Sequence, residues 1–440
     1  MACSCVRFLA LCLGLGLLLS ACEGDVSETV GQAQGMSLKV GKADELELSW
    51  LPADFPSEQD LAILVPMDVY PPLRADLATR DGGALLSATW LEQVSEAYED
   101  TDVMDALEVE NWYEEWQVVS VRIAPCGPLG HHPGHLDAGV CWPQVRVVWQ
   151  PVIEDFFAIH GVFVDRYADD RAVHALYRVH PSTEGAGQPE ILTRVLEHVA
   201  SGASFDQLGQ EDIVEFVKQR DLAIQRLVAD VADLREPVPG WVDREVIDVR
   251  VEYWSDAADA EQFHANLYDF LWSYAQPWAL HELTSFSLPE GRSPASIDIW
   301  VFVAFDAHDG VISPKDITVR SRFDGRELVN LGRSQTVSGE GEDEPILKAL
   351  EDPDVADELA AHVFLENSDA EVFGDVIADP TQTFVSNTTC ATCHRLTELS
   401  FDFHTFSFFE DRSATVSPRV ISDVANDLEV LRSYLAAPIP

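Results

Sequence analysis

Two cysteines and a histidine near the C-terminus form a motif that could do chemistry. They are Cys390, Cys393 and His394, in the pattern Cys-x-x-Cys-His. Two thiols three residues apart on a turn can each add to one vinyl group of the same porphyrin, and the adjacent imidazole can then bind the iron. The same thiols could instead close a structural disulfide, act as a redox pair or contribute half of a zinc site. A zinc site would need two further ligands, and no second cysteine pair follows.

The N-terminus predicts that the chain is exported. Arg7 is the only charge in the first 22 residues, and an apolar run from Phe8 to Leu19 follows it. The run is too short for a comfortable membrane span and ends in small residues, which is typical of a secretory signal peptide. Haem is attached to cysteines outside the cytoplasm, so an exported chain agrees with the haem interpretation of the motif.

The segment Leu19-Ser20-Ala21-Cys22 resembles the lipobox of bacterial lipoproteins. The resemblance implies cleavage before Cys22, lipid on that cysteine and a membrane as partner through the lipid anchor. By analogy with these lipoproteins, Glu23 after the cysteine, rather than Asp, favours the outer membrane, with the protein facing the periplasm or the cell surface. The alternatives are an ordinary signal peptide with a chance cysteine, or a short anchor helix.

Residues 387–404 resemble the c-type cytochromes at the level of the motif. The resemblance implies one haem c, with thioether bonds to Cys390 and Cys393 and with His394 as the proximal iron ligand. It also implies electron transfer, with a redox protein as a partner.

The sixth iron ligand is where the sequence departs from the usual pattern. Many small cytochromes c use a methionine downstream of the motif, but the four methionines here all precede it. His404 could close a bis-histidine site, which usually lowers the potential. An open position would suit peroxide chemistry instead, and His362 or His281 are further candidates for the ligand.

A second cysteine pair, Cys126 and Cys141, encloses three histidines, His131, His132 and His135. In an exported chain an even set of cysteines favours oxidation over free thiols. The interpretation we favour is a disulfide that staples a loop between two strands. The histidines could alternatively bind a transition metal.

The charge balance restricts the partners. The chain has 76 acidic and 28 basic residues, a formal net charge of −48. Duplex phosphates would repel this surface, so nucleic acid is excluded as a partner, whereas a basic redox protein would suit it. Hydrolase, metalloprotease and P-loop motifs are absent from the sequence, so an electron carrier or binding protein is favoured over an enzyme.

The periodicity of apolar residues predicts the elements that position these groups. Strands are expected at residues 116–123, 145–149, 156–164, 172–179, 247–254 and 297–305. Helical stripes run along residues 191–199, 213–234 and 263–271, and another helix begins at Pro418 with Val420, Val424, Leu428, Leu431 and Leu435 on one face.

These elements predict an α+β body with an antiparallel or mixed sheet and several helices, plus a small, mainly α C-terminal module. The expected divisions are a signal peptide (1–21), a tether (22–45), the body (46–331), an acidic Gly-rich linker (332–344) and a cytochrome c-like module (345–440) that opens with a helix within 346–364. The expected function is membrane-anchored electron transfer. The alternatives are a non-enzymatic surface lipoprotein with a Cys390–Cys393 disulfide, and a haem peroxidase.

Overall fold

The computed structural model describes most of the body and one C-terminal helix. The described residues are 55–66, 71–99, 113–129, 141–153, 157–159, 162–164, 167–168, 171–182, 187–201, 203, 205–234, 249–254, 257–287, 301–315, 416 and 418–436. They all belong to one compact unit, Leu46–Pro438. None of the helices within these ranges is long and apolar enough to cross a membrane.

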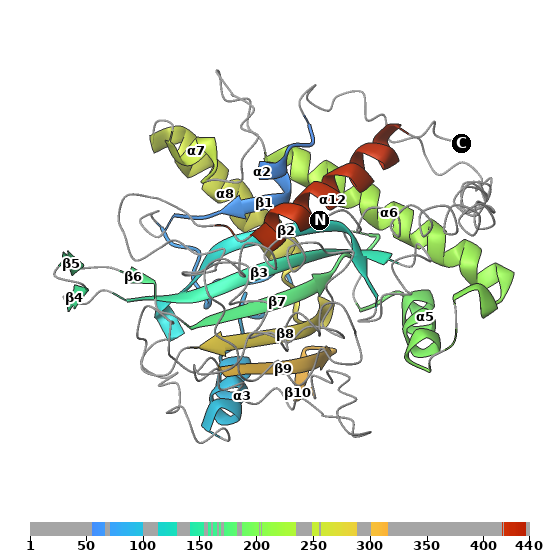
Figure 1. Cartoon of the computed structure of the whole chain (residues 1–440), viewed down its shortest axis with the longest axis horizontal. Coiled ribbons are helices and arrows are strands. Elements are labelled where there is room, and N and C mark those ends of the chain that lie inside the picture. The colour runs from blue at the N-terminus through green and yellow to red at the C-terminus, as the bar shows by residue number, and fades with distance from the viewer. Residues whose placement is uncertain are drawn as a thin grey trace, which may run out of the picture. The chain divides into compact units, whose positions relative to one another are not determined.

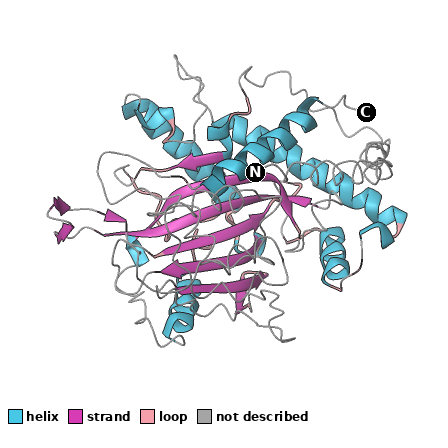
Figure 2. Cartoon of the chain, viewed as in Figure 1, coloured by secondary structure: helices cyan, strands magenta, loops and turns pink. Residues whose placement is uncertain are grey.

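An antiparallel sheet forms the centre of the described structure (Figures 1 and 2). Its strands lie in the order β1-β2-β3-β7-β8-β9-β10, and β6 pairs with β3 beside this path. The strands are β1 (Ala62–Leu64), β2 (Trp116–Pro128), β3 (Cys141–Ile153), β6 (Tyr167–Ala168), β7 (Ala172–Arg178), β8 (Leu280–Ser287), β9 (Val301–His308) and β10 (Val311–Pro314). A separate two-stranded sheet pairs β4 (Phe157–Ile159) with β5 (Val162–Val164).

Helices cover the sheet. The α-helices are α2 (Glu58–Leu61), α3 (Ala88–Glu99), α5 (Glu190–Ala200), α6 (Gln210–Leu234), α7 (Val251–Trp254), α8 (Ala257–Tyr274) and α12 (Pro418–Ala436). Short 3-10 turns lie at η3 (Tyr113–Glu115), η5 (Phe205–Gln207) and η6 (Pro277–Ala279). The sequence therefore folds as α+β, as its periodicity predicts, and all the strand pairs of the sheet are antiparallel.

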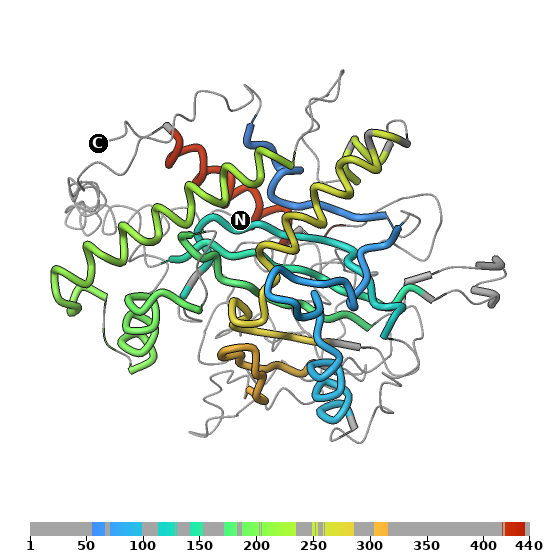
Figure 3. The backbone as a smooth tube through the Cα atoms, turned by 180° about the vertical axis from the view of Figure 1, so that it is seen from behind, coloured from blue at the N-terminus to red at the C-terminus, as the bar shows by residue number. Residues whose placement is uncertain are grey.

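One face of the sheet, here called the apolar face, is lined by residues that the strand register sets directly opposite one another. They are Val121, Val147, Ala175, Leu283 and Phe305, all buried. Helix α3 packs on this side, where the Tyr98 hydroxyl and the Ser285 hydroxyl lie 2.5 Å apart. Figure 3 shows α3, α6 and α8 in front of the sheet when the molecule is seen from behind. The main core therefore lies between the apolar face and these helices.

The opposite face carries charge. Because side chains alternate along a strand, the neighbours of the apolar residues point to the other side. There the register sets Arg122, Arg146, Leu176, Glu282 and Asp306 opposite one another across five strands. These residues define what is called here the charged face.

Helix α12 lies over the β2 end of the charged face, in front of the sheet in Figure 1. Its residues Val420, Val424, Leu428 and Leu431 are buried, which confirms the apolar stripe predicted from the sequence. On the polar side of this contact, Arg122 of β2 pairs with Asp423 at 2.9 Å and with Asp427 at 2.5 Å. Burial of one helical face and a charged clamp therefore hold the end of the chain on the sheet.

Two predicted strands differ in the structure. The expected strand at residues 156–164 is divided into β4 and β5, which pair with each other. The expected strand at residues 247–254 is wrong. Residues 247–254 alternate between apolar and polar types, but in the structure the chain turns after Arg250 and forms the short helix α7. The backbone N–H of Tyr253 donates to the Arg250 carbonyl at 3.0 Å. The polar members of the alternation, Arg250 and Glu252, are buried in an ion cluster rather than exposed on the outer side of a strand. The alternation therefore did not mark a half-exposed strand.

Candidate functional site

The residues predicted to carry the chemistry lie outside the described part of the chain. They are Cys22, Cys390, Cys393, His394 and His404. The linker at 332–344 and the helix expected within 346–364 also lie outside it. In the ranges that are described, no group of three or more His, Cys, Asp or Glu residues could hold a metal ion. The boundary between the body and the C-terminal module stays a prediction, although the last helix of that module, α12, packs on the body.

The predicted disulfide between Cys126 and Cys141 is confirmed. It joins the end of β2 to the start of β3, with the two Cα atoms 5.0 Å apart. A bulge between Ala124 and Gly127 shifts the register of the same strand pair. A Cβ atom on Gly127 would lie 2.3 Å from the Gln144 side-chain amide, so a larger residue at the bulge would require the Gln144 side chain to move.

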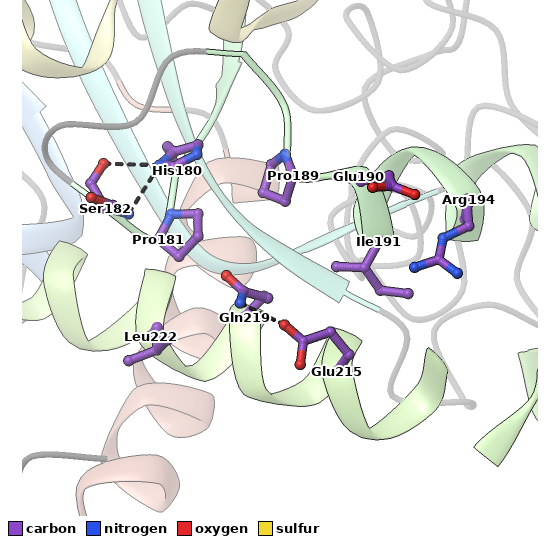
Figure 4. A pocket seen from close by; sticks show the side chains of 10 residues that line it. All are labelled: His180, Pro181, Ser182, Pro189, Glu190, Ile191, Arg194, Glu215, Gln219 and Leu222. Atoms are coloured by element: carbon purple, nitrogen blue, oxygen red, sulfur yellow. Dashed lines mark hydrogen bonds between the residues drawn. The ribbon is translucent and has the colours of Figure 1, made fainter. Parts of the chain in front are cut away.

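The described structure contains a pocket of about 440 Å³ where the end of β7 meets helices α5 and α6 (Figure 4). Its size lies within the range usual for small-molecule sites. The lining residues are His180, Pro181, Ser182, Pro189, Glu190, Ile191, Arg194, Glu215, Gln219 and Leu222. Strand β7 supplies its floor by continuing into His180, and the two helices supply the walls.

His180 is the one imidazole in this pocket. Its Nδ1 lies 2.9 Å from the Ser182 carbonyl oxygen and 3.0 Å from the Ser182 backbone nitrogen, so backbone groups occupy this nitrogen in either tautomer. Burial lowers the pKa of His180, and the positive charge of Arg226 lowers it further. The imidazole is therefore neutral at pH 7 and offers only Nε2 to a bound molecule.

A network behind the pocket fixes the position of His180. The Arg226 guanidinium donates to the carbonyl oxygens of His180 and Ser182 at 3.0 and 3.1 Å. It also lies 4.6 Å from the centre of the Tyr274 ring, and the Tyr274 hydroxyl donates to Asp230 at 2.6 Å. These contacts tie the end of β7 to α6 and α8, so the pocket is built on rigid elements.

Two of the charged residues of the pocket wall, Arg194 and Glu215, already have partners within the chain. Arg194 pairs with Asp212 at 2.7 Å, and the Gln219 amide donates to Glu215 at 2.7 Å. Among the described residues, the hydrogen bonds of the His180 ring go to backbone groups of Ser182. The pocket therefore presents the Nε2 atom of His180 to a small polar molecule.

A second buried cluster of ionisable groups is architectural. Arg250 contacts Asp60 at 3.1 Å and Glu252 at 2.5 Å, and all three side chains are at most 1% exposed. The guanidinium also donates to the Gln59 carbonyl and lies 4.8 Å from the centre of the Phe263 ring. It thereby connects α2, α7 and α8. No local sequence pattern predicts this cluster, because residues 60 and 250 meet only in the fold.

Comparison of the chain with models of known protein families, with curated proteins and with solved structures finds no match.

Proposed function

We propose that this chain is an exported, membrane-anchored lipoprotein that carries one covalent haem c and transfers electrons. Cys390 and Cys393 would form the thioether bonds, and His394 would bind the iron. The observation that carries the proposal is the occurrence of the Cys-x-x-Cys-His motif in the same chain as an export signal that ends at Cys22.

The chemistry of the donor set fits haem c. Two thiols at this spacing match the two vinyl groups of one porphyrin, and imidazole is a usual axial ligand of haem iron. Bound haem would supply a one-electron carrier. The residues of the chain would hold the porphyrin, orient its iron through His394 and set the sixth position, for which His404 is the candidate ligand.

The confirmed disulfide supports the compartment that the proposal needs. Cys126 and Cys141 are bonded to one another in the folded body, and structural disulfides of this kind are typical of exported proteins. The acidic surplus of the chain, 76 residues against 28, favours a basic redox partner. Lipid on Cys22 would keep the haem close to partners at the membrane.

Denaturing electrophoresis separates the proposal from its alternatives. A chain made in a host with an active haem-attachment system should keep its haem in the gel, and Cys390→Ser/Cys393→Ser should lose it. The matched control is Cys126→Ser/Cys141→Ser, which removes the other cysteine pair and should retain covalent haem. A colourless wild-type chain with Cys390 bonded to Cys393 would support a surface lipoprotein without a redox role and would contradict the proposal.

The sixth ligand has its own test. In a bis-histidine site, His404→Ala should convert the iron to high spin in the absorption spectrum. If the wild type and His404→Ala have the same high-spin spectrum, the sixth coordination position of the iron is open. That result would favour a haem peroxidase.

A further inference from the structure

Three arginines from neighbouring strands gather on the charged face of the sheet. Arg122 of β2 lies directly opposite Arg146 of β3, and Arg146 lies opposite Leu176 of β7. Arg178 follows two residues after Leu176, so it is the diagonal neighbour of Arg146 on the same face. Diagonal neighbours have Cβ atoms on the order of 7 Å apart, which is close enough for two long side chains to contact one small molecule.

The same carboxylate lies near both Arg146 and Arg178. Glu282 of β8 lies opposite Leu176, beside both arginines in the register, and its negative charge offsets part of the lowering of their pKa values by burial. The two arginines are therefore adjacent in the register, and both are partly exposed to solvent.

Among the residues that the structure describes, the guanidinium groups of Arg146 and Arg178 have no hydrogen bond and no ion pair within 4.0 Å. The Arg178 Nε is buried and has no acceptor in this part of the chain. Eight of the other ten described arginines contact a carboxylate, namely Arg74, Arg80, Arg122, Arg194, Arg220, Arg226, Arg250 and Arg419. In a chain with 76 acidic and 28 basic residues, carboxylates to pair with are plentiful.

The carboxylates nearest to these two arginines already serve other cations. Asp423 contacts Arg122 and Arg419, at 2.9 and 3.1 Å. Glu282 and Asp306 both contact Lys315, at 3.5 and 2.9 Å. Within the described part of the charged face, the positive charge of Arg146 and Arg178 is therefore not directly neutralised, because Asp423, Glu282 and Asp306 each contact another cation.

Partial burial of Arg146 and Arg178 without a paired anion destabilises the folded chain. Burial lowers the pKa of Arg146, and Arg122 opposite lowers it further. Burial lowers the pKa of Arg178 to about 10. Both groups remain charged at neutral pH, and a charge withdrawn from water without a partner is destabilising. Binding of an anion would remove this cost.

We propose that Arg146 and Arg178 form a binding site for a small oxyanion, a carboxylate or a phosphate, on the charged face of the sheet. The planar guanidinium group suits either anion, because its parallel N–H donors match two oxygens at once. Two sources share this chemistry, a free oxyanion of the cell envelope and the propionates of the haem proposed above. The site itself does not depend on the haem.

The test is calorimetric titration of the mature full-length chain with inorganic phosphate and with succinate, at constant ionic strength. Arg146→Met and Arg178→Met should each weaken binding roughly tenfold or more, the loss expected for hydrogen bonds to a charged group. Arg74→Met is the matched control, because Arg74 is paired with Asp76 and is not among the residues that line the pocket beside His180 or define the charged face. This variant should bind as the wild type does. In the absence of phosphate and succinate, the melting temperature of the double variant Arg146→Met/Arg178→Met should be no lower than that of the wild type.

A comparison of two forms shows whether the site binds a free oxyanion or the haem propionates. The same titration is carried out on the haem-loaded chain and on the haem-free variant Cys390→Ser/Cys393→Ser. Binding to both forms indicates a free oxyanion, and binding to the haem-free form alone indicates that propionates fill the site. No binding to either form, or equal binding by the double arginine variant, would overturn the proposal. A chain that acquires no haem would refute the proposed function, but its titration would still test the oxyanion site.

Discussion

Single buried arginines hold together parts of this chain that are far apart in sequence. Arg250 joins α2 to α7 through Asp60 and Glu252, and Arg122 joins β2 to α12 through two aspartates. A guanidinium group can do this because it has donors on several sides, and each donor can meet a different carboxylate. Neither contact could be predicted from the sequence, since the partners come together only after the sheet has formed.

Removal of Arg250 should be strongly destabilising. Arg250→Met would leave Asp60 and Glu252 buried without a cation, and breaking a buried pair in this way costs about 3–5 kcal/mol. Urea unfolding followed by circular dichroism measures the change. The matched control is Arg194→Met at the exposed Arg194–Asp212 pair, for which a change of about 0–1 kcal/mol is expected. Equal effects of the two substitutions would contradict the account of the buried cluster.

Asp427 should make the stability of the wild type depend on pH. Burial raises the pKa of Asp427 from 3.8 to about 6, although Arg122 offsets part of the effect. The protonated acid is favoured in the fold, so its contribution is complete below pH 3.8 and is lost as the pH rises through 6. The neighbouring Asp423 behaves differently, because Arg122 and Arg419 outweigh burial and lower its pKa.

Asp427→Asn should remove this dependence. Between pH 4 and pH 7, the wild type should lose on the order of 2 kcal/mol of unfolding free energy relative to Asp427→Asn. Chemical denaturation of both proteins at the two pH values measures the difference. A difference that does not change with pH would show that Asp427 is ionised throughout this window.

At the scale of elements, the sequence predicted the segments whose apolar pattern is long and regular. Strands β2, β3 and β7 and helices α5, α6, α8 and α12 lie where the periodicity places them. The short strands β1 and β10 have too few residues for a periodic signal, and the α3 and β8 segments were not recognised. The order of the strands, and with it the gathering of Arg122, Arg146 and Arg178, depends on register, which the sequence of one strand does not specify.

Helix α12 should contribute to the stability of the body. Leu431 is 2% exposed in the core, so Leu431→Ala should lower the unfolding free energy by about 2–5 kcal/mol. Ile421→Ala on the same helix is the control, because Ile421 is 41% exposed and its loss should change stability by less than about 0.5 kcal/mol. Tryptophan fluorescence reports the body, whose sheet contains Trp116, Trp142 and Trp149. An unchanged transition in Leu431→Ala would show that α12 folds separately from the sheet.

At the scale of the whole molecule, the account depends on an anchor and a motif at opposite ends of the chain. Cys22→Ser should release the protein from the membrane fraction, because one lipid-bearing residue supplies the proposed attachment. Fractionation of cells, followed by immunoblotting, measures the distribution. Substitution of Ser20, which is not the proposed lipid acceptor, by Ala is the control and should leave the protein in the membrane fraction. A membrane-bound Cys22→Ser protein would contradict the lipid anchor.

Some features of the body, and the C-terminal motif, can be predicted from the sequence, whereas the pocket of the body cannot. The α+β fold and the Cys126–Cys141 disulfide follow from local patterns, and both are found in the structure. The pocket beside His180 could not be foreseen, because its walls come from β7, α5 and α6 and meet only in the fold. The Cys-x-x-Cys-His motif differs from the pocket in this respect. Its residues lie within five positions of the sequence, so the motif can be recognised without knowledge of the fold.

A pyridine haemochrome spectrum tests the central claim most directly. The protein would be produced in a host with an active haem-attachment system and extracted with acidified acetone before measurement. The account predicts a c-type α-band that remains with the protein, in a ratio of one haem to one chain. A protein without this band, in which mass spectrometry finds Cys390 and Cys393 joined as a disulfide, would contradict it.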